Sequence, residues 1–214
     1  MSAYSFARKC VEIFYLHIKY KTRILNPENI PDLSGGFIVA CNHQSYSDPP
    51  VLAGIFKGRF SFMAKSELFK NKLFAWLIKK CGAFPVVRGA KDSAALDRAV
   101  EDLKQNKIFV IFPEGTRSKD GVIARAKSGV AMIAGMANAP VVPVCIMYGV
   151  DGKKRHMAAA IGKIIPKEEV AIEDMTDRRQ IKKVSSRIMD DIVRLQQQIC
   201  NEYHIPVPGS EGLL

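Results

Sequence analysis

The chain has 214 residues, of which 48% are hydrophobic and 25% are charged. These proportions suit one compact folded domain and exclude a disordered or low-complexity protein. Five cysteines stand at positions 10, 41, 81, 145 and 200 without a C-x-x-C spacing. This pattern argues against a disulfide framework or a zinc site, and it is typical of reduced thiols in a cytoplasmic protein.

The formal net charge is +11, and its distribution along the chain is uneven. Residues 1–25 carry five basic side chains and one acidic one, and residues 57–80 carry seven and one, whereas residues 131–214 are almost neutral. Localised positive charge suits an anionic membrane surface, a nucleic acid or a generally basic soluble surface. Charge alone does not choose among these three.

Residues 1–30 are expected to form an N-terminal amphipathic helix and a linker. Apolar side chains recur at steps of three and four residues, as on one face of a helix: Tyr4, Ala7, Val11, Phe14 and Ile18. Basic residues interrupt this stripe, so it does not predict a membrane-spanning helix. The helix either lies in a membrane interface or packs on the rest of the protein.

Residues 31–214 are expected to form one domain in which strands and helices alternate. Strands are predicted at 37–41, 59–64, 83–87, 107–112, 140–147 and 156–161, and helices at 49–58, 67–82, 93–106, 128–138 and 177–203. This alternation predicts an α/β fold with a mostly parallel central sheet flanked by helices. In such sheets, binding sites collect where the strands end.

Two of these segments have more than one interpretation. Residues 128–150 contain no charge and are long enough to span a membrane, but Asn138, Pro140 and Pro143 favour a buried helix, a turn and a strand. The helix at 67–82 has aromatic and leucine residues on one side and lysines on the other. Its apolar residues either pack on the core or contact a membrane.

The most distinctive stretch is "FIVACNHQSYSDPP", where an apolar run stops at His43 and a carboxylate follows at Asp48. A separation of five residues puts two side chains about 140° apart on a helix, so they can meet only if the chain turns between them. Asp48 before Pro49 also has the position of a helix N-cap. A fixed carboxylate can accept a hydrogen bond from one imidazole nitrogen and leave the other as a base.

The nucleophile in such a reaction is open to question. Cys41 is a conceivable thiolate nucleophile, but the preceding apolar run buries it. A His–Asp pair without a nucleophilic side chain indicates that the base activates a hydroxyl of the substrate itself. Several cationic or turn-forming residues follow predicted strands or begin helices, where they can bind a phosphate together: Lys65, Arg88, the segment Glu114-Gly115-Thr116-Arg117, and Lys127.

Four blocks of sequence, in order, resemble the glycerolipid acyltransferase family and specifically its bacterial 1-acyl-sn-glycerol-3-phosphate acyltransferases. The blocks are "NHQSYSD", "GAFPVVRG", "FPEGTRS" and "VVPVCI", and the resemblance covers residues 37 to about 165. It implies that His43 deprotonates the sn-2 hydroxyl of lysophosphatidic acid while Asp48 orients the imidazole. The resulting alkoxide would attack the thioester of acyl-CoA or acyl carrier protein directly.

The resemblance also assigns the acceptor site and the location. The residues implied to hold the glycerol phosphate are Arg88, Glu114, Gly115, Thr116 and Arg117, with Lys65 and Lys127 as additional candidates. Glu114 is expected to orient Arg117 or a glycerol hydroxyl rather than to touch phosphate. No metal or bound cofactor is implied, since the acyl thioester is a substrate. The enzyme is expected at the cytoplasmic face of the cell membrane, as a peripheral or monotopic protein on its anionic surface.

Three other functions remain open from the sequence. The enzyme could acylate another lysophospholipid or alcohol. A non-catalytic module binding anionic membrane or nucleic acid is a second alternative, although no nucleic-acid recognition motif is present and nucleic acid is not an expected partner. A thioesterase or lipase is the third, and the absence of a G-x-S-x-G sequence counts against the lipase.

Overall fold

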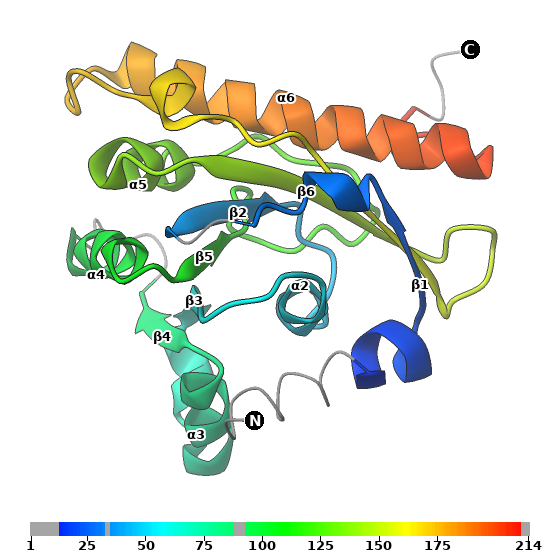
Figure 1. Cartoon of the computed structure of the whole chain (residues 1–214). Helices are drawn as coiled ribbons and strands as arrows, with labels where there is room; N and C mark the ends of the chain where they lie inside the picture. Colours follow the sequence, from blue (N-terminus) through cyan, green and yellow to red (C-terminus); the bar gives the residue numbers. More distant parts are fainter. Residues whose placement is uncertain (1–12, 33–34, 88–92, 211–214) are drawn as a thin grey trace.

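The computed structural model describes residues 13–32, 35–87 and 93–210. Within them the sheet has seven strands in the order β1-β7-β6-β2-β5-β3-β4 (Figure 1). The strands are β1 (Lys21–Leu25), β2 (Phe37–Cys41), β3 (Phe60–Lys65), β4 (Ala83–Val86), β5 (Ile108–Ile111), β6 (Val141–Tyr148) and β7 (His156–Ile161). All neighbouring pairs are parallel except β6 with β7. The predicted α/β fold with a mostly parallel sheet is confirmed.

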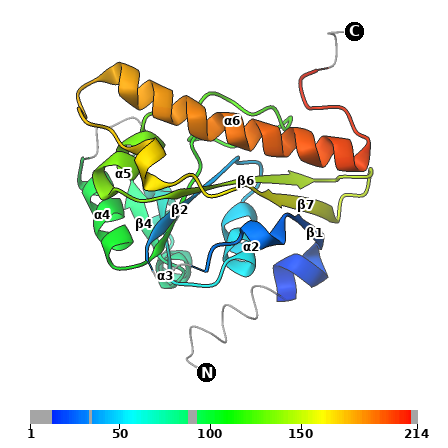
Figure 2. The same cartoon turned by 45° about the horizontal axis from the view of Figure 1, so that its top comes forward.

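Helices cover both faces of the sheet (Figures 1 and 2). They are α2 (Asp48–Ile55), α3 (Lys72–Lys80), α4 (Ser93–Lys104), α5 (Gly129–Ala137) and α6 (Arg178–Tyr203). There are also a π-helix, η1 (Ile13–Lys19), within the predicted N-terminal helix, and the short 3₁₀-helices η2 (Pro27–Asn29), η3 (Ser66–Phe69) and η4 (Lys167–Val170). No helix in the described ranges is both long and apolar enough to cross a membrane.

The core is divided between the two faces of the sheet. On one face, Ile38 and Ala40 of β2 pack with buried residues of α4, α5 and α6. On the other face, Phe37, Val39 and Cys41 pack with α2 and with η1. Because side chains alternate between faces and both faces are covered, β2 is buried along its whole length, which explains its continuous apolar sequence.

The uncharged stretch from 128 to 150 folds inside the domain, as its asparagine and two prolines predicted. It contains α5, a turn and β6, which lies next to β2 in the middle of the sheet. Asn138 ends α5 in a left-handed conformation with φ of 47°. Asparagine tolerates this conformation, so the helix stops there and the chain reverses into the strand.

Two segments differ from the prediction. The expected helix and linker of residues 1–30 contain β1, an edge strand beside β7, so the sheet begins before the expected boundary at residue 31; residues 1–12 lie outside the described part of the chain. The expected helix at 67–82 is divided into η3 and α3. It divides because the Asn71 side chain accepts a hydrogen bond from Phe74 N and so begins a new helix.

Candidate active site

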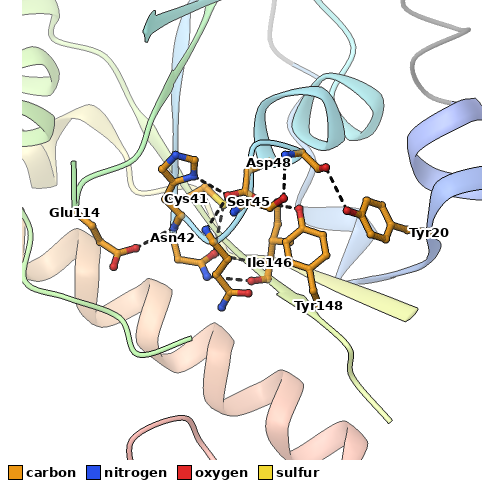
Figure 3. Close-up of polar contacts among 11 residues, drawn as sticks. Tyr20, Cys41, Asn42, Ser45, Asp48, Glu114, Ile146 and Tyr148 are labelled. Atoms are coloured by element: carbon orange, nitrogen blue, oxygen red, sulfur yellow. Dashed lines mark hydrogen bonds and ion pairs between the residues drawn. The ribbon is translucent and has the colours of Figure 1, made fainter. Parts of the chain in front are cut away.

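The predicted turn brings His43 and Asp48 together. The Nδ1 atom of His43 lies 2.6 Å from Oδ2 of Asp48 (Figure 3). His43 follows β2, and Asp48 is the first residue of α2. The carboxylate turns back toward the loop and accepts hydrogen bonds from Gln44 N and Ser45 N, both at 2.8 Å. Its expected role as an N-cap of α2 is therefore wrong, because its oxygens bind N–H groups that precede the helix.

The Asp48 carboxylate is fully buried and held by hydrogen-bond donors. Besides the two backbone N–H groups on Oδ2, the hydroxyl of Tyr148 donates to Oδ1 at 2.6 Å (Figure 3). Burial, followed by the charge of Asp48, raises the pKa of Tyr148, so its hydroxyl remains a donor. A carboxylate has no proton to donate, so Nδ1 of His43 is the donor in its contact with Asp48. In this tautomer Nε2 of His43 keeps its lone pair.

The imidazole of His43 is fixed on its other sides as well. Its ring stacks on Phe112, with 4.0 Å between centroids and 19° between planes. Its backbone N–H donates to Oε1 of Glu114 at 2.9 Å, and its carbonyl accepts from Ser118 N at 2.8 Å. His43 lines a large cavity, and its side chain is 12% exposed. The ring is therefore held firmly at the cavity wall.

The Glu114 side chain connects the backbone at His43 with the backbone at Ala124. It is buried, and its second oxygen, Oε2, accepts from Ala124 N at 2.9 Å. With Oε1 bound to His43 N, both oxygens bind N–H groups and neither binds Arg117, which was one of its two expected partners beside a glycerol hydroxyl. Glu114 is not among the residues that line the cavity. It positions the turn of residues 114–118 against His43.

Gly115 and Lys127 form a close contact in that turn. Gly115 has φ of +71°, a conformation that favours glycine. A Cβ atom at this position would lie 2.7 Å from Nζ of Lys127, so the lysine side chain crosses directly over the glycine backbone. Both residues line the cavity. The absent side chain of Gly115 thus lets the cation of Lys127 approach the turn.

The cavity has a volume of about 1740 Å³ and a strongly cationic lining. Its described wall contains one carboxylate, Asp190, and six cationic side chains: Lys65, Arg117, Arg125, Lys127, Arg178 and Lys182. The guanidinium of Arg117 lies 3.7 Å from the ring centroid of Tyr46. This is a cation–π contact between two residues that both line the cavity.

Not every predicted phosphate-site residue lines the cavity. Thr116, like Glu114, does not line it, and its side chain is exposed. Arg88 lies outside the described residues; Val86 and Val87, just before it in the sequence, line the cavity. Lys65 lines the cavity and also pairs with Glu67 at 2.8 Å. That ion pair lowers the pKa of Glu67 to about 2.

Cys41 does not have the properties of a nucleophile. Its side chain is completely buried behind the His43 turn. Burial, followed by the charge of Asp48, raises the pKa of its thiol well above the ordinary value. It remains a thiol in the core, which leaves the His–Asp pair as the reactive group at this end of β2.

Three residues of the site were not predicted to have roles in it. Tyr148 binds Asp48, Phe112 stacks on His43, and the Asn42 side chain exchanges two hydrogen bonds with the backbone of Ile146 (Figure 3). The Asn42 contacts tie the end of β2 to β6. A buried amide directly after an apolar strand is a usable sequence signal for such a role. Tyr148 and Phe112 give no local signal, because their partners are distant in sequence.

Comparison with known proteins identifies the family. Residues 21–147, which contain every predicted site residue, match the family model described as Acyltransferase. The chain belongs to the acyltransferase family. It is 33% identical over 173 residues to 1-acyl-sn-glycerol-3-phosphate acyltransferase of Bacillus subtilis, covering 78% of this chain and 85% of that protein. It is 34% identical over 143 residues to the Streptococcus pneumoniae protein of the same name, covering 66% and 53%.

The fold is shared with a solved member of the family. The crystal structure of the 1-acyl-sn-glycerophosphate (LPA) acyltransferase PlsC from Thermotoga maritima superposes with a TM-score of 0.67 at 27% identity. The similarity covers 90% of this chain and 82% of that one. The acyltransferase similarity thus extends well beyond the motifs around His43.

Proposed function

We propose that this acyltransferase moves a fatty acyl group from an acyl thioester to the sn-2 hydroxyl of 1-acyl-sn-glycerol 3-phosphate, which gives phosphatidic acid. The observation that carries the proposal is the 2.6 Å contact between His43 and the buried Asp48 at the wall of a cationic cavity. The names of the relatives and of the structural neighbour support this acceptor.

The His–Asp pair supplies a general base for the acceptor hydroxyl. Nε2 of His43 makes no hydrogen bond to another described residue and is free to take the sn-2 proton. As the proton leaves, the hydroxyl oxygen attacks the thioester carbonyl carbon, a C–O bond forms and the C–S bond breaks. The imidazolium returns its proton to the leaving thiolate. Asp48 stabilises the imidazolium that exists between these two transfers.

The cavity has the size and charge that two substrates need. Small-molecule sites commonly have volumes of about 300–1000 Å³, and this one, at about 1740 Å³, can hold a lysophospholipid beside an acyl thioester. Arg117, Lys127 and the Gly115 turn lie on the same wall as His43, and they are the proposed partners of the acceptor phosphate. We assign Arg88 and Lys65 to the binding of the same phosphate. We assign Thr116 and Glu114 to the turn of residues 114–118, which holds Gly115 and Arg117 in place for that binding.

The acyl donor is proposed to be acyl-CoA or acyl carrier protein, bound as a substrate. Since the acceptor is a membrane lipid, we place the enzyme at the cytoplasmic face of the cell membrane as a peripheral or monotopic protein. The positive charge of the chain supports attraction to an anionic lipid surface.

The test is product formation with matched acceptors. The purified protein is incubated with lysophosphatidic acid, or with the monoacylglycerol of the same acyl chain, and with each donor in turn. We expect phosphatidic acid from lysophosphatidic acid and little product from the monoacylglycerol, because that acceptor has no phosphate for the cations. Equal rates with both acceptors would contradict the assigned acceptor, and release of free fatty acid without acceptor would indicate a thioesterase.

A further inference from the structure

Helix α3 exposes large apolar side chains that most helices of soluble domains bury. The exposed fractions are 77% for Leu73, 60% for Trp76 and 42% for Phe74. An adjacent group of exposed large apolar residues marks an interaction surface more often than a chance arrangement. The interpretation in which these residues pack on the core does not hold for these three.

The arrangement of residues around α3 is that of an interfacial helix. At 100° per residue, Leu73, Trp76 and Lys80 fall within an arc of about 60°. Ala75, which is buried, lies on the opposite side and packs against the protein. Lys72 and Lys79 lie together on the Trp76 side of this arc, and both are exposed. The free face of α3 therefore combines exposed apolar side chains with lysines, and Lys80 lies within the arc between Leu73 and Trp76.

The charge around α3 identifies the partner. Four exposed lysines lie on or just before the helix: Lys70, Lys72, Lys79 and Lys80. The nearest acidic residue in the sequence is Glu67, whose charge is already paired with Lys65. A cluster of cations beside exposed leucine and tryptophan complements an anionic bilayer, in which the apolar groups enter the interface and the lysines reach lipid phosphates.

The position of α3 connects this surface with the cavity. The preceding turn, η3, contributes Leu68 to the cavity wall. In both views, α3 extends from the β4 edge of the sheet on the side away from α6, and η1 lies on that same side (Figures 1 and 2). Exposed apolar residues are also present on η1, namely Ile13, Phe14 and Ile18.

We propose that α3 is a lipid-docking helix that inserts Leu73 and Trp76 into the interface of an anionic bilayer. Its lysines bind the lipid headgroups. The benefit to catalysis rests on the proposed function, because docking here places the Leu68 side of the cavity near the membrane that contains the acceptor. The docking itself does not depend on any acyl transfer.

The chain contains a single tryptophan, Trp76, so its fluorescence reports directly on the proposed surface. Vesicles of phosphatidylcholine alone are compared with vesicles that also contain phosphatidylglycerol, using the full-length protein. We expect the emission maximum to move to shorter wavelength with the anionic vesicles, and brominated lipids to quench it. An unchanged maximum for protein that has bound the vesicles would overturn the proposal. An emission maximum already at short wavelength without vesicles would also overturn it, because another part of the protein would then cover the helix.

Matched variants distinguish docking through α3 from non-specific adsorption to vesicles. Leu73→Ser is expected to weaken partition into anionic vesicles about tenfold, whereas Met136→Ser on α5, also an exposed apolar residue, leaves it unchanged. Lys79→Gln is expected to weaken it about fivefold, and Lys183→Gln on α6 is the control. Equal effects of the test and control variants would contradict the assignment to α3.

The two proposals can fail separately. With a short-chain lysophosphatidic acid that is soluble without vesicles, Leu73→Ser should acylate as fast as the wild type. If the wild type docks but acylates no lysophosphatidic acid, the proposed function fails and the docking surface stands. If it acylates soluble acceptor but Trp76 never enters a bilayer, the docking surface fails alone.

Discussion

Replacing Asp48 by asparagine removes the negative charge beside His43 and changes the shape of the side chain little. The amide oxygen can occupy the place of Oδ2, where it accepts from Gln44 N, Ser45 N and Nδ1 of His43. The amide NH₂ group then faces the hydroxyl of Tyr148, which can accept as well as donate. The turn and the tautomer of His43 are retained, so the variant isolates the effect of charge.

The size of this effect follows from the contact distance. Nδ1 of His43 and Oδ2 of Asp48 lie 2.6 Å apart. This distance puts the centre of the imidazolium charge about 4 Å from the centre of the carboxylate charge, and the attraction between them is then about 4 kcal/mol at an effective dielectric constant of about 20. That dielectric constant suits a ring at a cavity wall. Because about 1.4 kcal/mol corresponds to a factor of ten in rate, kcat is expected to fall about 10³-fold in Asp48→Asn.

The assay is the initial rate of phosphatidic acid formation at saturating concentrations of both substrates. Asp151→Asn is the matched control, because Asp151 pairs with Nδ1 of His156 at 2.7 Å and neither residue lines the cavity. The control should retain the wild-type rate. A folded Asp48→Asn enzyme with a kcat within tenfold of wild type would refute the electrostatic role of Asp48.

Three further predictions follow from other contacts. Tyr148→Phe removes a hydrogen bond to a buried carboxylate, so the free energy of unfolding in urea should fall by about 1.5–3 kcal/mol. Gly115→Ala should displace Lys127 and raise KM for lysophosphatidic acid, whereas Gly149→Ala, with the same φ of +71° and no neighbour within 4 Å, should not. Burial alone would raise the pKa of Asp102, but hydrogen bonds from Lys107, Ser61 and Arg98 lower that pKa below its ordinary value. The ionised Asp102 therefore stabilises the fold above about pH 4, and this stabilisation is lost as the pH falls through the pKa of Asp102 in the folded protein. The difference in unfolding free energy between wild type and Asp102→Asn should therefore narrow in acid.

The sequence predicted the fold well where the hydrophobic pattern of a segment matches its burial in the structure. β2 and β5 are short apolar runs because helices cover both faces of the sheet, and such runs are visible in the sequence. β1 was missed because it is an edge strand with exposed Lys21 and Arg23, and its sequence continues that of a basic amphipathic helix. Its strand conformation depends on pairing with β7, whose paired residues are 135 positions later in the chain, as in Lys21 with His156.

In the site, too, contacts between residues close in sequence were predictable and contacts between distant segments were not. The contact of His43 with Asp48 was predictable because the residues that make the turn lie between them. The role of Glu114 was not, because its partners are backbone N–H groups, which no residue type reveals. Tyr148 reaches Asp48 only because β6 lies beside β2 in the sheet.

The central claim is that His43 activates the hydroxyl of the acceptor, and one comparison tests it most directly. The rate of acyl transfer to lysophosphatidic acid is measured for the wild type and for His43→Ala, with the folding of both confirmed by urea denaturation. The account predicts that the wild type forms phosphatidic acid and that the folded variant forms it at least 10³-fold more slowly, a loss within the range expected for general-base catalysis. Equal rates for the two proteins would contradict the account.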